Sequence, residues 1–256
     1  MWSPRWPQAW KPICSDGSAV AAADLIPPPP AHAADVVSSN IVGYEKINLA
    51  AGAYYLSGSQ FVKVGGNNAT LNDLFSSTDI PFDTEVLTLN ASGTYDHFYY
   101  LEEAYDAESD DFIQGWGDGS EEYVTDTLPP GTGFWVKAPE SYSLTQAGEV
   151  VSSDSITIDV PKDQLVMIAN PFPEGFNPNA VTWSDNLPYD TEIMTLNASG
   201  SYDHFYYLEE AYDEQTDDFI TGWGNGSEEY VTGNIASFGQ GIWIKSTESI
   251  SLTIKK

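Results

Sequence analysis

Acidic residues recur at matching separations in two parts of the chain, and carboxylates at this density could ligate a hard cation. Calcium takes about six to eight oxygen ligands, readily from acidic loops with glycine turns. The spacing is not that of an EF-hand loop, so a solvated acidic loop and a calcium or other hard-cation site both stay open as interpretations. The candidate metal ligands are Asp106, Asp110, Asp111 and Asp118, and in the second part Asp213, Asp217, Asp218 and Asn225.

Aromatic residues lie near these acids, and exposed rings beside carboxylates could bind a sugar by stacking on its C–H groups. The same residues could instead fill a core between sheets, because aromatic side chains contribute a large burial energy. Trp135 and Trp243, each in the middle of an apolar run, are expected in the core. The candidate ligand-binding residues are Trp116, Tyr99 and Tyr105, with Trp223, Tyr206 and Tyr212 in the second part.

Catalytic signatures are weak throughout the sequence. The adjacent pairs 102–103 and 209–210 are glutamates and could supply the two carboxylates of a glycosidase. In so acidic a chain, however, such pairs are expected by chance. His97 and His204 each lie in a tyrosine-rich segment and are predicted to be structural. The sequence therefore predicts that the protein is not an enzyme and assigns no catalytic residue.

These candidates belong to a stretch that the chain contains twice. Residues 83–125 and 190–232 differ at eight of 43 positions. Cores tolerate hydrophobic exchange when volume and pattern are kept, so drift should change acidic loops at least as fast as core positions. The acidic loops are nevertheless preserved nearly as well. Either both copies must present the same surface, or the duplication is recent.

Charge limits the partners that the chain can take. It has 38 Asp and Glu against nine Lys and Arg, a formal net charge of −29 at pH 7. Phosphate binding needs basic patches, so no nucleic-acid partner is expected. Neither Lys nor Arg occurs between Lys63 and Lys137, or between Lys162 and Lys245. The carboxylates in these gaps must face water, bind cations or meet a basic partner, because burying them unpaired would be too costly.

Residues 1–37 differ in composition from the remainder. They contain Cys14, the only cysteine, and residues 31–34 (AHAA) resemble the cleavage site of an export signal. The preceding apolar region is short and is interrupted by Asp24. A leader and a disordered extension stay alternative interpretations of this segment. No apolar run approaches the length of a membrane-spanning helix, so no transmembrane segment is predicted.

Short strands must position the candidate residues. Alternating segments separated by Gly and Pro turns predict an all-β fold with little helix beyond one turn at 71–75. Gly93 supplies the positive φ for a hairpin loop that recurs in the second copy. Residues 115–119 (GWGDG) are predicted as a tight turn, the Gly-Trp turn. The expected architecture is two tandem β-sandwich-like or barrel-like units of about 105–113 residues. The predicted divisions are 1–37 as leader or disordered extension, 38–150 as first β unit and 151–256 as second β unit.

Three motifs occur in order along the chain. Residues 39–44 read SNIVGY, 130–137 read PGTGFWVK and 148–150 read GEV. Together they resemble uncharacterised secreted β-rich proteins of the Planctomycetes–Verrucomicrobia kind, which carry SNIVGY and PGxGFWVK elements. The resemblance covers residues 38–256, although the second copy lacks SNIVGY and has SFGQG at 237–241. It implies export and an extracellular or cell-surface location, and it carries no catalytic residues.

The leading hypothesis is a secreted or cell-surface, non-enzymatic structural or adhesion protein with calcium as its candidate cofactor. Its candidate partners are further copies of itself or an extracellular polysaccharide. The alternative is a carbohydrate-binding module that uses the Gly-Trp turns and neighbouring tyrosines. A third hypothesis is an extracellular glycoside hydrolase. Exposed tryptophans would favour sugar binding, and buried tryptophans would favour a structural role. An exposed edge strand would favour assembly by strand addition.

Overall fold

Strands make up nearly all of the regular structure. A computed structural model describes residues 41–183 and 187–256, which contain 18 strands and one four-residue helix. All pairs of named strands are antiparallel. The predicted all-β class is confirmed, whereas the division into units 38–150 and 151–256 stays a prediction. The predicted segment 1–37 lies outside the described residues. Among the described residues, no helix is long and apolar enough to cross a membrane.

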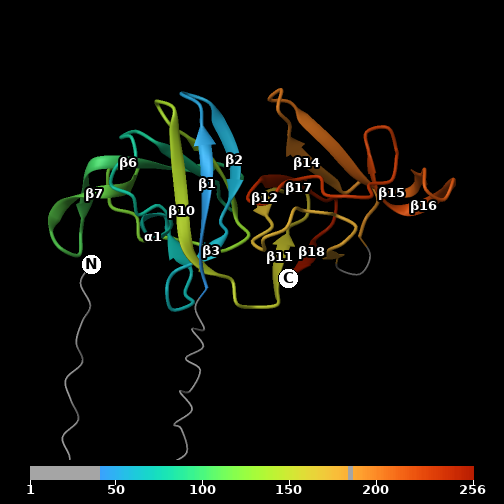
Figure 1. Cartoon of the computed structure of the whole chain (residues 1–256), viewed down its shortest axis with the longest axis horizontal. Helices are drawn as coiled ribbons and strands as arrows, with labels where there is room; N and C mark the ends of the chain where they lie inside the picture. The colour runs from blue at the N-terminus through green and yellow to red at the C-terminus, as the bar shows by residue number, and fades with distance from the viewer. Residues whose placement is uncertain (1–40, 184–186) are drawn as a thin grey trace, which may run out of the picture. The chain divides into compact units, whose positions relative to one another are not determined.

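A five-stranded sheet with strand order β2-β9-β5-β6-β7 dominates the first half of the described chain, residues 41–150 (Figure 1). The predicted hairpin joins β5 to β6. Asn90 closes its loop by accepting the backbone N–H groups of Ser92 and Thr94, and Gly93 has φ 77°. The strands are β2 (Tyr54–Gly58), β5 (Glu85–Leu89), β6 (Tyr95–Asp106), β7 (Asp111–Asp118) and β9 (Gly133–Lys137).

The second half, residues 151–256, contains a five-stranded sheet of matching order, β12-β17-β14-β15-β16. Its long hairpin, β15 and β16, has the same register shift as β6 and β7, so the duplicated sequence adopts the same pairing twice. The strands are β12 (Leu165–Ala169), β14 (Glu192–Leu196), β15 (Tyr202–Asp213), β16 (Asp218–Asn225) and β17 (Gly241–Lys245).

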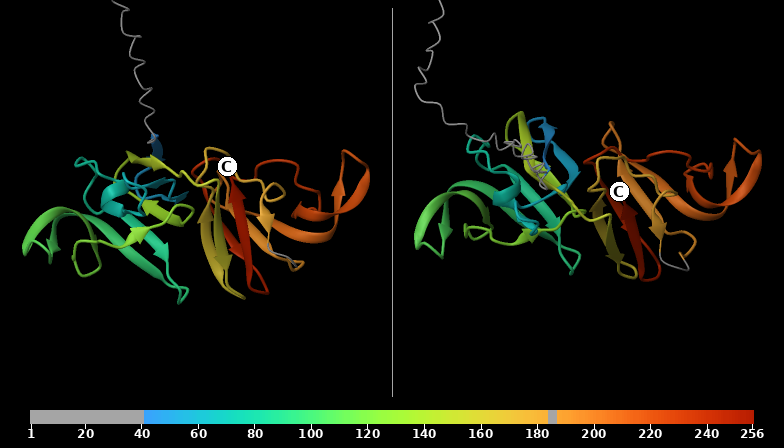
Figure 2. Two further views of the ribbon diagram at one scale, coloured as in Figure 1. Left: turned by 90° about the horizontal axis from the view of Figure 1, so that it is seen from below. Right: turned by 60° about the horizontal axis from the view of Figure 1, so that its bottom comes forward.

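Each half also has a three-stranded sheet that covers one face of its larger sheet. The orders are β1-β10-β3 and β11-β18-β13, and Figure 2 shows β18 beside β11. A two-stranded sheet, β4 with β8, completes the first half. The strands are β1 (Val42–Leu49), β3 (Phe61–Val62), β4 (Ala69–Thr70), β8 (Thr127–Leu128), β10 (Tyr142–Val150), β11 (Ser155–Val160), β13 (Thr182–Trp183) and β18 (Ile250–Lys255).

A hydrophobic core lies between the larger and the smaller sheet of each half. Alternate residues of the strands point into it, as the two-residue period of a β-strand requires. In the first core, Phe134 and Leu144 are fully buried on opposite sheets. In the second core, Ile244 and Leu252 are likewise fully buried. The fold of each half therefore depends on two sheets that cover one another.

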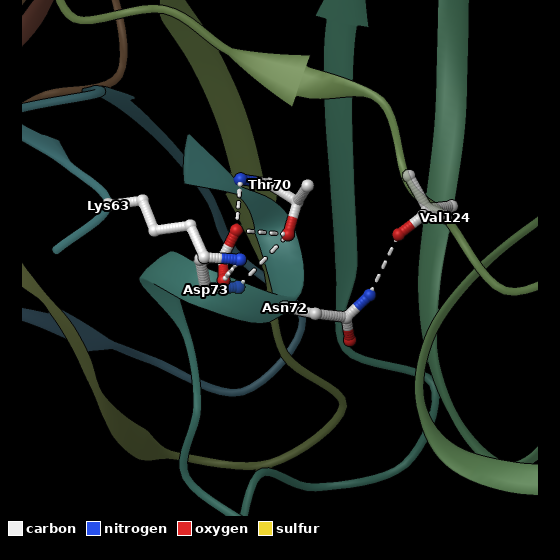
Figure 3. A network of polar contacts seen from close by, with 5 residues as sticks. All are labelled: Lys63, Thr70, Asn72, Asp73 and Val124. Atoms are coloured by element: carbon white, nitrogen blue, oxygen red, sulfur yellow. Dashed lines mark hydrogen bonds and ion pairs between the residues drawn. The ribbon is translucent and has the colours of Figure 1, made fainter. Parts of the chain in front are cut away.

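The predicted helical turn is α1 (Leu71–Leu74), and it anchors the loop that follows β7. Thr70 caps the helix by accepting the N–H of Asp73, whose carboxylate accepts the N–H of Thr70 and pairs with Lys63 at 2.9 Å (Figure 3). The neighbouring Asn72 donates to the carbonyl of Val124 at 3.0 Å. The second half has the equivalent hydrogen bond, in which Asn179 donates to the carbonyl of Val231 at 2.8 Å, although Asn179 lies in a turn and not in a helix.

The two halves meet through a reciprocal pair of backbone hydrogen bonds. The N–H of Gly58, at the end of β2, donates to the carbonyl of Gly239 at 3.0 Å. The N–H of Ala169, at the equivalent end of β12, donates to the carbonyl of Gly131 at 2.9 Å. Gly131 and Gly239 have φ values of 88° and 76°, a conformation that favours glycine. Reciprocity of this kind characterises a two-fold, isologous contact.

Side chains of both halves form a third hydrophobic cluster at this junction. Leu56, Met167 and Trp243 are buried there, and Trp135 packs against them. Trp135 and Trp243 were predicted as core residues. They are packed, but at the junction rather than between the sheets of one half. The outer faces of the two larger sheets are thus partly shielded by one another.

We expect the junction to tolerate no side chain at Gly241. A Cβ atom there would lie 2.5 Å from the carbonyl oxygen of Ser57 and 2.9 Å from Leu56 Cγ. The Gly241→Ala variant should therefore lose about 1–3 kcal/mol of unfolding free energy, measured by urea denaturation. Gly226→Ala is the matched control, because no atom lies within 4 Å of its added Cβ. Equal stability of the two variants would contradict the close approach.

Candidate functional site

The structure buries both tryptophans that the sequence offered as sugar-binding residues. Trp116 is 0% and Trp223 1% exposed. Trp116 packs against Phe75 and Tyr100, with ring centroids 5.7 and 5.6 Å apart. Neither indole can stack on a sugar, so this part of the candidate site is wrong and both residues belong to the cores.

The Gly-Trp turn was also predicted wrongly, because Gly115, Trp116 and Gly117 lie within β7. These glycines are needed for close packing rather than for a turn. A Cβ at Gly115 would lie 2.6 Å from the ring of Tyr123, and one at Gly117 would lie 2.6 Å from Leu101. Gly-x-Gly is therefore a packing signal here, with the intervening indole pointing into the core.

The candidate tyrosines do not form one site. Tyr105 and Tyr212 lie at the far ends of the long hairpins, where their hydroxyls donate to Asp110 and Asp217 at 2.9 and 2.8 Å. Their rings lie 5.5 Å from those of Phe112 and Phe219, which are about 60% exposed. Tyr99 and Tyr206 lie elsewhere on the same strands, half-buried on the outer faces of the larger sheets.

The acidic residues are divided between separate turns of the first hairpin. Asp106 accepts from Ser109 Oγ at 2.7 Å and from the N–H of Glu108, and these bonds lower its carboxyl pKa. Asp111 accepts the N–H of the residue after it. Asp118 pairs with Phe98 at the opposite end of β7. Asp118 also accepts the N–H groups of Ser120 and Glu122, so it is already used in a turn of its own.

The second hairpin uses its candidate ligands in the same way. Asp213 is buried and accepts from Thr216 Oγ1 at 2.9 Å. Asn225 accepts the N–H groups of Ser227 and Glu229 at 2.9 and 3.0 Å. Asp217 adopts φ 57° in the turn. Across residues 41–183 and 187–256, no three His, Cys, Asp or Glu side chains are grouped so that they could hold a metal ion. The structure thus offers no assembled site for the predicted cation.

A cluster that sequence analysis did not assemble lies on the outer face of the first larger sheet. Glu85 of β5 accepts from Tyr54 of β2 at 3.0 Å and contacts His97 Nδ1 of β6 at 2.8 Å. Tyr99 stacks on His97, and Lys137 Nζ lies 4.9 Å from the centre of the Tyr54 ring. Burial raises the pKa of Glu85, but the hydrogen bonds from His97 and Tyr54 outweigh it, so the net shift is downward.

The second half repeats most of this arrangement, which we call the Glu-His-Tyr cluster in both halves. Glu192 Oε1 lies 2.6 Å from His204 Nδ1, and Tyr206 stacks on that histidine. Leu165 occupies the position of Tyr54, because each pairs with the terminal lysine of its neighbouring strand. Since Nδ1 of each histidine contacts the glutamate, Nε2 is left to meet a ligand. The cluster can therefore offer a ring face and a polar atom side by side.

The alternation of Tyr95, His97 and Tyr99 along one strand was the only sequence signal for this cluster. It identifies one face of β6, but the glutamate and the second tyrosine come from other strands. Glu102 and Glu103, the suggested acid/base pair, are instead exposed at the bulge of β6. Their counterparts Glu209 and Glu210 are exposed in the same way.

A cavity of about 440 Å³ lies at the junction of the halves. Residues of the 129–133 turn form one side, and residues of β11 and β12 form another. Asp159 is the only charged residue among those that line it. Glycoside hydrolysis generally uses two carboxyl groups, so this cavity does not supply the groups for that chemistry.

We expect calcium to raise the melting temperature no more than magnesium does at equal ionic strength. The acidic side chains are spread over separate turns and already accept hydrogen bonds, so neither ion finds six or more oxygens. The check is thermal unfolding of the full chain with millimolar calcium, magnesium or chelator. A calcium-specific rise of several degrees would contradict this, since only a ligand of the native state stabilises by mass action.

Comparison with known proteins gave no relatives: no protein-family model, no curated protein and no solved structure matches the chain. The resemblance carried by SNIVGY and PGTGFWVK therefore stays an expectation. Functional inference for this protein depends on its own residues and their geometry.

Proposed function

We propose that this protein is a secreted or surface-displayed, non-enzymatic structural and adhesion protein, which associates with further copies of itself by strand addition along β1. The observation that carries the proposal is the open edge of this strand. Among residues 41–183 and 187–256, β1 pairs only with β10 and is the terminal strand of its sheet. An unpaired edge presents backbone N–H and C=O groups to another chain.

The backbone of β1 turns alternate residues toward that edge. Val150 N–H donates to the carbonyl of Ile41 at 2.8 Å, which identifies residues 41 and 150 as a hydrogen-bonded pair. Such pairs alternate with non-bonded ones in an antiparallel ladder. The N–H and C=O groups of Val42, Tyr44 and Lys46 consequently point away from β10. A second strand can pair with these groups without displacing any bond to β10.

The side chains along this edge favour association. Ile41, Val42 and Tyr44 are 68%, 66% and 72% exposed, an unusual run of large apolar groups in water. The only charged residue that β1 exposes is Lys46, because Glu45 is turned inward. In a chain of net charge −29, this edge is thus a place where two copies repel one another least. Salt should strengthen the association by screening the remaining repulsion.

Strand addition predicts that Lys46→Pro weakens self-association by at least about tenfold. Proline removes an outward N–H and is tolerated at sheet edges, where that group faces solvent. Lys46→Ala, which keeps the N–H, is the matched control. Sedimentation velocity at low and high salt measures the association, and thermal unfolding confirms that both variants fold. A wild-type chain that stays monomeric in high salt, or a proline variant that associates normally, would refute the proposal.

A second candidate function is carbohydrate binding at the two Glu-His-Tyr clusters. The specific observation is that Tyr99 with His97, and Tyr206 with His204, form equivalent stacked pairs beside a carboxylate. These pairs are partly exposed, unlike the two tryptophans. Two equivalent sites on one chain would also raise avidity for a repetitive polysaccharide, provided that both can engage at once.

For this candidate, replacing both Tyr99 and Tyr206 with alanine should abolish retardation of the protein in polysaccharide-containing gels. Each single variant keeps one cluster and should retain part of the retardation. The double variant at Tyr105 and Tyr212 is the control, because it removes two tyrosines from the far ends of the same hairpins. Equal mobility of both double variants in every polysaccharide tested would eliminate the clusters as sugar sites.

A further inference from the structure

The side chains at the reciprocal junction differ between the halves. Ser57 Oγ donates to the carbonyl of Gly239 at 3.2 Å, whereas Ile168 holds the equivalent position in the second half. A further difference lies on β1 and β11. The pairs Leu49–Tyr142 and Val160–Ile250 occupy matching ends of the strands β1 and β11. Four residues before Leu49 on β1 is Glu45, which pairs with Gln146 of β10. Four residues before Val160 on β11 is Ile156, which pairs with Ile254 of β18. A polar pair thus stands where the other half has two isoleucines.

These two positions contact the glycines that carry the junction. Ile156 covers Gly131, where an added Cβ would lie 2.5 Å from Ile156 Cδ1. Glu45 covers Gly239 in the same manner, with its carboxyl oxygens next to the place where a Cβ would stand. Each of these glycines accepts one of the two junction hydrogen bonds. An apolar side chain therefore flanks one bond, and a carboxyl group flanks the other.

The carboxyl of the half-buried Glu45 belongs to a network whose other members are buried. Gln146 is 0% exposed, and its Nε2 donates to Glu45 Oε2 at 2.6 Å and to the carbonyl of Gly58 at 2.9 Å. Gln146 Oε1 accepts the N–H of Gln60 at 3.3 Å, while Gln60 Oε1 is buried without a recorded partner. Gln60 Nε2 also donates to the carbonyl of Gly58 at 3.5 Å, and a proton on Glu45 would add one more donor to this network.

No base on the surrounding elements neutralises Glu45. On β1, Tyr44 and Lys46 point to the opposite, exposed face, as strand alternation requires. On β10 the nearest ionisable residue is Glu149, which is itself buried. On β2 the ionisable groups are Tyr54 and Tyr55, and the segment 237–240 has none. Partial burial raises the pKa of Glu45 to about 7, although the bond from Gln146 lowers it.

We propose that Glu45 makes the junction between the halves pH-dependent, holding the Gly58–Gly239 bond when protonated and loosening it when ionised. The ionised carboxylate is drawn toward water and away from Gly239, whereas the Ala169–Gly131 bond beside Ile156 does not respond. The sign follows from proton binding. Because its pKa is above the usual 4.5, the native protein binds more protons than the unfolded chain between about pH 4.5 and 7. The contribution of Glu45 to stability therefore decreases as pH rises through this window.

The chain supplies its own control for the test, since the amides of Gly58 and Ala169 make equivalent bonds across the junction. Hydrogen exchange by NMR at pH 5 and pH 8, corrected for intrinsic rates, should show protection of Gly58 falling by at least about tenfold. One pKa unit is tenfold in equilibrium, and the pKa of Glu45 lies more than one unit above 4.5. Protection of Ala169 should stay constant. In the Glu45→Gln variant, which is permanently neutral, both amides should keep their protection at both pH values.

The Glu45 carboxyl carbon should titrate with a midpoint near 7 in the wild-type protein. A midpoint near 4.5, or equal pH responses of Gly58 and Ala169, would overturn the proposal even if the glutamine variant failed to fold. Retention of the wild-type response by Glu45→Gln would overturn it as well. Repeating the exchange at two protein concentrations separates this effect from association through β1.

Discussion

The close backbone approach between β2, β12 and the two glycine turns is the contact on which the rest of this structure depends. Each larger sheet has one face in its own core and one face that would otherwise lie in water. The reciprocal bonds of Gly58 and Ala169 bring these outer faces together, so that Leu56, Met167 and Trp243 are shielded at the junction. Glycine is required because side chains at these points would keep the strands apart.

The negative net charge of the chain limits where two copies of the protein can make contact. The acids of the long hairpins mostly face water, and several of them accept hydrogen bonds from the turns that carry them. The same charge opposes contact between copies everywhere except where the acids are few. The edge of β1 satisfies that condition, and salt reduces the repulsion further. The proposed assembly and the acidic composition are therefore compatible.

Sequence patterns predicted what depends on local periodicity, and they failed where distant strands meet. The all-β class, the hairpin at Gly93 and the helical turn before Phe75 follow from alternation and turn residues. The Glu-His-Tyr cluster does not, because Tyr54 and Glu85 come from strands 31 residues apart. Glu45 and Gln146 are 101 residues apart, so nothing local indicates that they meet. Gly115 and Gly117 were misread because glycine permits both turns and close packing, and only the neighbouring Tyr123 and Leu101 decide between them.

The mismatch between Glu45 and Ile156 also bears on how the chain avoids misassembly. Nearly identical segments in one chain invite the wrong halves to pair, within a molecule or between molecules during synthesis. Two first halves joined in the same manner would enclose two carboxyl groups, and two second halves would enclose none. Only the pairing of unlike halves gives the junction described here. The strands outside residues 83–125 and 190–232, which differ between the halves, thus distinguish the two halves, whereas the nearly identical hairpins cannot.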